Sequence, residues 1–393
     1  MPLEIQLSDP DLMRDPFTAY GRAREQAPVA ALVAPGFGPF WAVTRHAEAR
    51  AMLADPRFTL GEESYQHLDV PDAARPYLHT MQQTSGDEHT RLRRLVSPEF
   101  SARRGADFRP RLEKIVATLL DELERTADPD GTVDLVRHFA NPLPMEVICE
   151  LVGVPDDDRP QWRTYGAAVA SGQGAAFTAA IPAIIEGAQA AVASRRGTPG
   201  QDVISQLVRS RADDKLTERE LVTFVWHLVL AGQTPAPLIA NAVPTLLDHP
   251  DQLAAFLNGT ANGTATGAVE ELLRWCGPQL LTIPRQARED VELGGELVHK
   301  GEPVTAILAA ANRDPRVFKD PDRFDVHRTP NPHLSFAHGP HFCLGAPLAR
   351  EQTEVALTAL FARYPALTLA DPAPQRIPDP ATWRLPTLRV QLR

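Results

Sequence analysis

A ten-residue segment, Phe336 to Gly345 with the sequence FAHGPHFCLG, most constrains what this chain can fold into. It is rich in glycine and histidine, and it places Cys343 directly before a stretch of helical character, APLAREQTEVALTALFARY. A cysteine just ahead of a helix N-terminus lies near free backbone N–H groups and the positive end of the helix dipole, which favour thiolate over thiol. The segment therefore predicts a thiolate at Cys343 that can ligate a metal or attack an electrophile.

The other two cysteines and the ends of the sequence indicate the compartment. Cys149 and Cys276 are expected to be buried as small hydrophobic residues, and three scattered cysteines give no disulfide framework. The first residues lack the basic and apolar regions of a signal peptide, and no run approaches the roughly 20 apolar residues of a membrane span. We expect a cytoplasmic protein that is not bound to a membrane.

Length and charge narrow the class further. A chain of 393 residues with 43% hydrophobic and 23% charged residues has a globular composition, and no linker interrupts it, so a single domain over residues 1–393 is predicted. Forty basic against fifty acidic residues give a net charge of -10, which argues against nucleic acid as a partner.

Periodicity predicts a mainly α fold with a minor β region. Residues with helical spacing run over 109–125, 145–152 and 162–195, and the strongest pattern starts at Thr217, which has capping-box spacing to Glu220. Short apolar or alternating runs near residues 40, 291 and 302 and at the C-terminal end predict strands.

The cysteine segment resembles the haem-binding loop of the cytochrome P450 superfamily, FGxGxHxCxG. The matching positions are Phe336, Gly339, His341, Cys343 and Gly345, while Ala337 replaces the first glycine. The resemblance implies the cytochrome P450 fold, with a long central helix over a b-type haem (heme b). Cys343 would be the iron ligand, and the N–H groups of Leu344 and Gly345 would donate to its thiolate. No CxxCH sequence is present for covalent haem attachment.

Further landmarks follow the order of that family. The resemblance implies that four residues bind the haem propionates: His89 and Arg93 in EHTRLRRLV, Arg285, and His341. Glu271 and Arg274 in EELLRW, with Arg323 in PDRF, would form a buried Glu-Arg-Arg network beneath the haem loop.

The central helix departs from the family pattern A-G-x-acid-Thr, whose acid and Thr handle the protons of oxygen activation. The corresponding residues are Ala231, Gly232, Gln233, Thr234 and Pro235, so that Pro235 stands in place of the Thr. A second proline follows at Pro237. Pro235 and Pro237 each lack an N–H donor, so the carbonyls of Ala231 and Gln233, four residues earlier, should lose their helical partners, and we expect a kink. Either the prolines only exaggerate a bulge that relatives share, or ordered water or a polar group of the substrate delivers the protons. We prefer the second interpretation, with the Thr234 hydroxyl bonded back to the carbonyl of Leu230.

The resemblance also implies partners. Arg91, Arg94, Arg103 and Arg104 concentrate positive charge in an acidic protein, which suits an acidic ferredoxin, itself served by a ferredoxin reductase. The hydrophobic small-molecule substrate would lie among the loop 61–86, the helices near 168–180, Val229 to Gly232, Leu280 to Ile283, and the turn at Thr382 and Trp383.

Together these features predict a haem-thiolate oxidase, a cytochrome P450 monooxygenase, acting in secondary metabolite biosynthesis. It would hydroxylate, epoxidise or otherwise oxidise a bulky metabolite of polyketide or peptide type, using dioxygen and electrons from a separate ferredoxin. One alternative is a peroxide-driven or radical oxidative-coupling haem enzyme. A further alternative is a degenerate recruitment module, which the retention of Cys343, His89, Arg93 and Arg285 disfavours.

Overall fold

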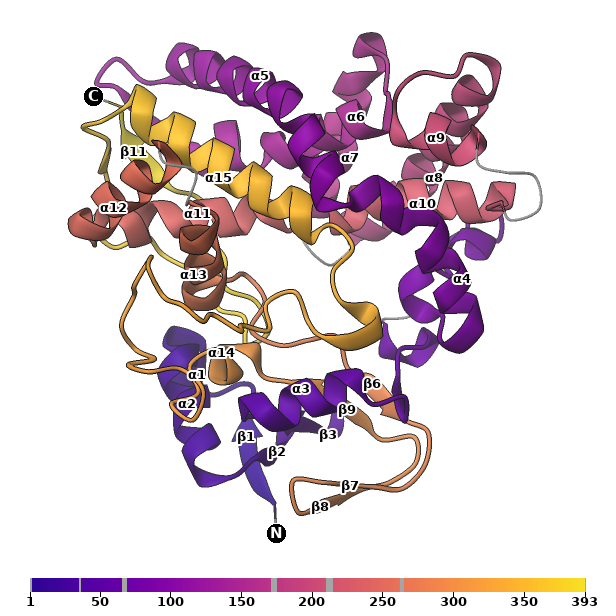
Figure 1. Cartoon of the computed structure of the whole chain (residues 1–393), viewed down its shortest axis with the longest axis vertical. Helices are drawn as coiled ribbons and strands as arrows, with labels where there is room; N and C mark the ends of the chain where they lie inside the picture. The colour runs from indigo at the N-terminus through magenta and orange to yellow at the C-terminus, as the bar shows by residue number, and fades with distance from the viewer. Residues whose placement is uncertain are drawn as a thin grey trace. The chain divides into compact units, whose positions relative to one another are not determined.

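A computed structural model describes residues 2–34, 37–65, 69–170, 175–209, 215–261 and 265–392 (Figure 1). The chain forms two compact units, each assembled from three separate segments. Unit 1 comprises Met1–Tyr65, Asn241–Ala346 and Gln375–Pro386, and unit 2 comprises Gln66–Ala240, Pro347–Pro374 and Thr387–Arg393. The structure is mainly α with small sheets, as predicted from periodicity. The single domain stays a prediction.

Unit 1 contains a six-stranded mixed sheet with the order β1-β2-β3-β9-β6-β4. Its strands are β1 (Leu3–Gln6), β2 (Val29–Ala34), β3 (Phe37–Val43), β4 (Phe58–Thr59), β6 (Arg285–Ala287) and β9 (Pro303–Ala306). The β1/β2 and β3/β9 pairs are parallel and the other pairs are antiparallel. The predicted strand near residue 291 is a hairpin of β7 (Val291–Leu293) and β8 (Glu296–Val298), whose two-residue turn, Gly294-Gly295, has positive φ at both positions.

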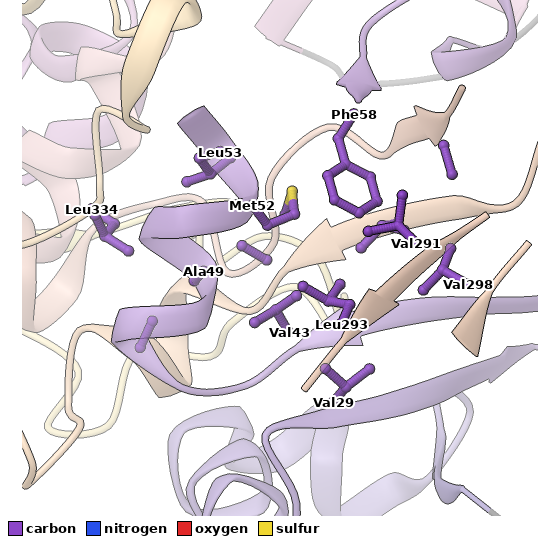
Figure 2. Packing of buried hydrophobic residues seen from close by; sticks show 14 of the residues in the cluster. Val29, Val43, Ala49, Met52, Leu53, Phe58, Val291, Leu293, Val298 and Leu334 are labelled. Atoms are coloured by element: carbon purple, nitrogen blue, oxygen red, sulfur yellow. The ribbon is translucent and has the colours of Figure 1, made fainter. Parts of the chain in front are cut away.

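One face of this sheet is covered by α3 (His46–Ala54). Figure 2 shows the side chains of Met52 and Phe58 converging with those of Val43 and Val291 between the helix and the strands. These four residues are at most 2% exposed, so the cluster forms a closed apolar layer. The other helices of unit 1 are α1 (Pro10–Arg14), α2 (Pro16–Gln26), α12 (Pro250–Ala261), α13 (Thr266–Cys276) and α14 (Leu308–Ala311).

Unit 2 is mostly helical and has a three-stranded sheet in the order β10-β11-β5. Its strands are β5 (Thr132–Asp134), β10 (Thr368–Leu369) and β11 (Arg389–Gln391). Its helices are α4 (Gly86–Val96), α5 (Ala102–Thr126), α6 (Pro142–Val152), α7 (Arg159–Ala170), α8 (Ala175–Gly197), α9 (Val203–Arg209), α10 (Glu218–Ala231) and most of α15 (Ala346–Arg363). α11 (Pro235–Leu247) begins in unit 2 and belongs to unit 1 from Asn241 onward.

The predicted helices are present, but α5 and α6 begin earlier than predicted, α6 at Pro142 instead of Met145. α5 begins at Ala102, capped by Ser101, so that Pro110 lies inside the helix instead of at its start. α6 ends as predicted at Gly153, whose φ of 72° is the left-handed conformation that favours glycine.

Two segments have the length and apolar composition of a membrane span, Phe177–Gly197 and Glu218–Leu247. The second is interrupted at Gly232–Thr234, because α10 ends at Ala231 and α11 begins at Pro235. A buried core helix of a soluble protein meets the same criterion.

Candidate active site

The cysteine loop lies in unit 1 and is held by backbone hydrogen bonds. The N–H of Cys343 donates to the carbonyl of Phe336 at 2.9 Å, and that of Phe342 donates to the carbonyl of Gly339 at 3.0 Å. Ala337, in place of the family's glycine, has φ +59°, a left-handed conformation that strains an L-residue by roughly 1–2 kcal/mol. Its methyl group packs against the apolar cluster below α3, which offsets part of this strain.

The glycine at position 339 is required by close packing on the end of α3. A Cβ at this position would lie 2.7 Å from the carbonyl oxygen of Leu53, and the φ of Gly339 is +76°. The loop therefore docks on α3 through backbone. Cys343 is only partly buried, whereas Cys149 and Cys276 are buried as predicted, and none of the three forms a disulfide.

A buried charge network lies behind the loop, but one of its members differs from the prediction. Arg274 donates to both carboxylate oxygens of Glu271 at 2.7 and 2.8 Å, and both side chains are fully buried. The second arginine on this carboxylate is Arg328, whose Nε lies 3.1 Å from Glu271 Oε2. Arg323 is exposed and contributes only its carbonyl oxygen, which accepts from Arg274 and Arg328. The assignment of Arg323 was therefore wrong, because its side chain points to solvent.

Asn312 connects this network to the start of the cysteine loop. Its carbonyl accepts from Arg274 Nη1 at 3.0 Å, while its side chain accepts from the N–H of Leu334 at 2.7 Å and donates to Ser335 Oγ at 2.9 Å. The Glu271 network thereby fixes the backbone just before Phe336. Sequence reasoning missed both Asn312 and Arg328.

Arg285 supplies a buried positive charge in unit 1. It is 3% exposed, and its Nη1 donates to the carbonyl of Leu53 at 2.7 Å. Desolvation lowers its pKa to about 10, and no carboxylate within the described residues forms an ion pair with it. Such a cation is stable only with an anion beside it, and a haem propionate is an anion of the right kind.

In unit 2, α4 presents the two other predicted propionate ligands. His89 and Arg93 are four residues apart on one face of this helix. His89 is 5% exposed, and both desolvation and the charge of Arg93 lower its pKa, so that it is neutral at pH 7.

The donor set fits haem. Cys343 offers a single sulfur ligand, and the buried cation of Arg285 offers a partner for a propionate. Within the described residues, no group of three or more His, Cys, Asp or Glu side chains could hold a metal ion. Unit 1 holds Phe336, His341, Cys343, Leu344, Gly345 and Arg285, and unit 2 holds His89, Arg93, Ala231, Gly232 and Thr234.

The central helix is broken completely where a kink was predicted. Pro235 and Pro237 occupy the first turn of α11, where N–H groups have no helical partner and a missing donor costs little. The carbonyl of Gln233 still accepts from the N–H of Ala236 at 3.1 Å. This carbonyl loses its helical partner at Pro237, as predicted, but the bond from Ala236 means that it is not left free.

Thr234 bonds to a different carbonyl from the one predicted. Its hydroxyl donates to the carbonyl of Ala231 at 3.0 Å, not to that of Leu230, so the Ala231 carbonyl is engaged. Ala231 and Thr234 are exposed on an otherwise buried stretch, whereas the amide of Gln233 is buried and has no hydrogen-bond partner among the described residues.

Among the arginines assigned to ferredoxin, Arg91 and Arg104 have acidic partners within unit 2. Arg91 forms an ion pair with Glu220, and Arg104 lies 3.3 Å from Glu99. Arg94 and Arg103 are exposed.

Parts of the predicted substrate lining belong to the core of unit 1. Leu280 is fully buried, and Trp383 packs against its cluster and edge-on against Phe17. Ile283 keeps 38% of its surface exposed. Residues 66–68 and 171–174 of the predicted lining lie outside the described residues.

His227 lies on α10, one turn before Ala231, and we expect it to make the free energy of unfolding fall in acid. Desolvation lowers the pKa of His227 from 6.5 to about 4. Between these two pH values the unfolded chain therefore binds a proton at this residue that the folded chain does not bind. The contribution of neutral His227 to the free energy of unfolding is fully present above pH 6.5 and is lost as the pH falls toward 4. Between pH 7 and 5 the loss is about 2 kcal/mol.

We expect His227→Gln to remove this component, so that its free energy of unfolding in urea falls by about 2 kcal/mol less than that of the parent between pH 7 and 5. His299→Gln, at a mostly exposed histidine, is the control and should follow the parent. Equal losses in all three proteins would show that His227 is protonated in the fold.

The comparisons agree with these features. The family model for cytochrome P450 matches residues 265–392. The chain is 39% identical to cytochrome P450 monooxygenase PikC of Streptomyces venezuelae, over 100% of this chain and 94% of that protein. It is 40% identical to 6-deoxyerythronolide B hydroxylase of Saccharopolyspora erythraea, over 95% of each. The solved structure of the bacillaene polyketide synthase cytochrome P450 PksS from Bacillus subtilis matches with TM-score 0.87 and 31% identity, over 99% of both chains. The chain belongs to the cytochrome P450 family and is a haem-binding monooxygenase.

Proposed function

We propose that this protein is a tailoring monooxygenase that hydroxylates or epoxidises a bulky, largely apolar natural product of polyketide or peptide type. The observation that carries the proposal is similarity over nearly the whole chain to a hydroxylase of 6-deoxyerythronolide B and to a cytochrome P450 of a polyketide synthase. We place its activity in the cytoplasm.

Bound haem would supply the redox chemistry, in which one oxygen atom of dioxygen enters the substrate and the other leaves as water, with two electrons from the ferredoxin and two protons consumed. Cys343 is the residue proposed to bind its iron, with the N–H groups of Leu344 and Gly345 directed to the thiolate. Arg285, His341, His89 and Arg93 are proposed to bind its propionates. The uncompensated buried charge of Arg285 supports this assignment.

Proton delivery is the step at which this chain departs from the family pattern A-G-x-acid-Thr. Pro235 has neither a hydroxyl nor an N–H, and the Thr234 hydroxyl is committed to the carbonyl of Ala231. We propose that ordered water or a polar group of the substrate conducts protons past Ala231 and Gly232, with the free amide of Gln233 available to hold such a water.

We expect Thr234→Ala to lower product formed per NAD(P)H only modestly, because its hydroxyl already donates within the backbone turn. Removing a polar group of the substrate near its oxidation site should uncouple the reaction strongly. The measurement is product formed against NAD(P)H consumed and peroxide released. Severe uncoupling in Thr234→Ala, with full coupling of the trimmed substrate, would assign the protons to Thr234.

The presence of Pro235 where the family pattern has Thr also favours one second candidate, a peroxide-driven or radical-coupling enzyme. Turnover with NAD(P)H, ferredoxin reductase and ferredoxin should exceed turnover with peroxide if the tailoring proposal is right. Faster turnover with peroxide would favour the alternative.

Exposed Arg94 and Arg103 are the residues proposed to meet the ferredoxin. Their substitution by Ala should slow reduction of the haem and weaken the dependence of that reduction rate on ionic strength.

A further inference from the structure

A cavity lies within unit 2 between α4, α10 and the short helical turn Met81–Gln83. It has an empty volume of about 350 Å³, including the space at its mouth. Most of its wall is apolar and comes from Met81, Leu92, Val96 and Phe224. Leu92 and Val96 lie on α4 and are at most 7% exposed, so this wall is firmly packed.

Three polar side chains of α10 also line this cavity: Glu220, Thr223 and His227. Thr223 and His227 are four residues apart, which places them on one face of the helix. Within the described residues, neither the Thr223 hydroxyl nor a ring nitrogen of His227 has a hydrogen-bond partner. Both side chains line the cavity, so a ligand bound there can pair with their polar atoms.

The charge of the cavity specifies the chemistry of that ligand. Glu220 reaches the cavity, but Arg91 pairs with its carboxylate, and the carboxylate also accepts from the N–H of Thr217 at 2.7 Å. Burial raises the pKa of Glu220, and these hydrogen bonds outweigh it, so the residue is ionised and neutralised in place. His227 is uncharged at pH 7. The α10 side of the cavity therefore offers hydrogen bonds without an unpaired charge, which suits a hydroxyl or ketone oxygen and disfavours a carboxylate.

We infer that Thr223 and His227 form a polar anchor for an uncharged oxygen group, a hydroxyl or ketone, carried on an apolar substrate. This inference rests on the proposed function and adds a specificity-determining pair to it. A neutral imidazole can both donate and accept, and the Thr hydroxyl can do the same, so the pair accommodates either group.

The helix also sets a distance. Four residues of α-helix rise roughly 6 Å, so His227 and Thr223 precede Ala231 by roughly 6 and 12 Å along the axis of α10. If oxygen is inserted beside Ala231 and Gly232, the anchored oxygen of the substrate lies on the order of 6–12 Å from the oxidised carbon.

The test compares cyclododecanol with cyclododecane, which share an apolar ring and differ in one hydroxyl. Binding to the holoprotein is measured by equilibrium dialysis in one buffer and co-solvent. We expect the alcohol to bind roughly tenfold more tightly than the hydrocarbon, and cyclododecanecarboxylate to bind less tightly than the alcohol. In the double variant Thr223→Val, His227→Leu the tenfold preference should disappear while the affinity for the hydrocarbon is kept.

The matched control is Thr118→Val, His299→Leu, which removes the same functional groups outside the cavity and should retain the preference. A preference that survives in the Thr223, His227 variant, or tighter binding of the carboxylate, overturns the inference. If that variant does not fold, the ring ¹⁵N resonances of His227 in the parent decide the matter. They should shift with the alcohol and not with the hydrocarbon, and no shift contradicts the anchor.

Dialysis does not depend on turnover, so the two proposals fail separately. Loss of the alcohol preference in an enzyme that oxidises apolar natural products removes only the anchor. An intact preference in a protein without oxygenase activity removes only the proposed function.

Discussion

Cys343→Ser should abolish the thiolate-type absorption spectrum of the reduced carbon monoxide complex. A serine hydroxyl keeps the size of the side chain but contains no sulfur, so it cannot supply the thiolate ligand on which that spectrum depends. We expect haem content to fall severalfold and monooxygenase activity to be lost, whereas the loop keeps its backbone bond from residue 343 to Phe336.

Cys276→Ser is the matched control. Cys276 is 3% exposed, and its Sγ donates to the carbonyl of Leu272 at 3.3 Å, a bond that a serine hydroxyl can also make. This variant should keep the parental spectrum. A thiolate-type spectrum in Cys343→Ser would show that another residue binds the iron.

Glu271→Ala should yield protein that does not hold haem or does not fold. The change leaves Arg274 buried without its carboxylate partner and removes the acceptor of Arg328. Breaking a buried ion pair on one side costs roughly 3–5 kcal/mol, a large part of the stability of an ordinary domain. The network reaches Leu334 and Ser335 through Asn312, so the cysteine loop should loosen with it.

Two arginine variants separate the network that is present from the one first predicted. Arg328→Ala should destabilise strongly, because its guanidinium bonds to Glu271. Arg323→Ala should melt like the parent, because only the backbone carbonyl of residue 323 takes part. The measurements are melting temperature and haem content per chain. A Glu271→Ala protein that melts with the parent, or a larger effect at Arg323 than at Arg328, would contradict this network.

The error at Arg323 shows what spacing alone cannot decide. PDRFDVHR contains two arginines five residues apart, and either could meet the carboxylate of a helix about 50 residues earlier. The chain turns between them, so that the peptide N–H of Asp325 donates to Glu271 Oε1 at 2.9 Å and only Arg328 can reach the same carboxylate. That turn is a tertiary feature with no local sequence pattern.

Local patterns, by contrast, were reliable. The capping box of Thr217 and Glu220 formed, with the N–H of Glu220 donating to Thr217 Oγ1 at 3.2 Å, since all its partners lie within four residues.

The complete break at Pro235 was not predicted, because a proline in a helical pattern either kinks the helix or starts a new one. Leu280 was assigned to a pocket although it is core, since apolar residues line both.

The composite make-up of the two units has a consequence for how the protein is made on the ribosome. β3 pairs with β9, where Trp41 lies opposite Val304, and β5 pairs with β11, where Val133 lies opposite Val390. Neither sheet can be completed until strands hundreds of residues downstream have been translated, and β11 emerges last of all. Nascent chains must therefore wait with unpaired strand edges, the condition in which chains aggregate. Recombinant yield should consequently respond to slower synthesis and to chaperones more than to changes in the helices of unit 2.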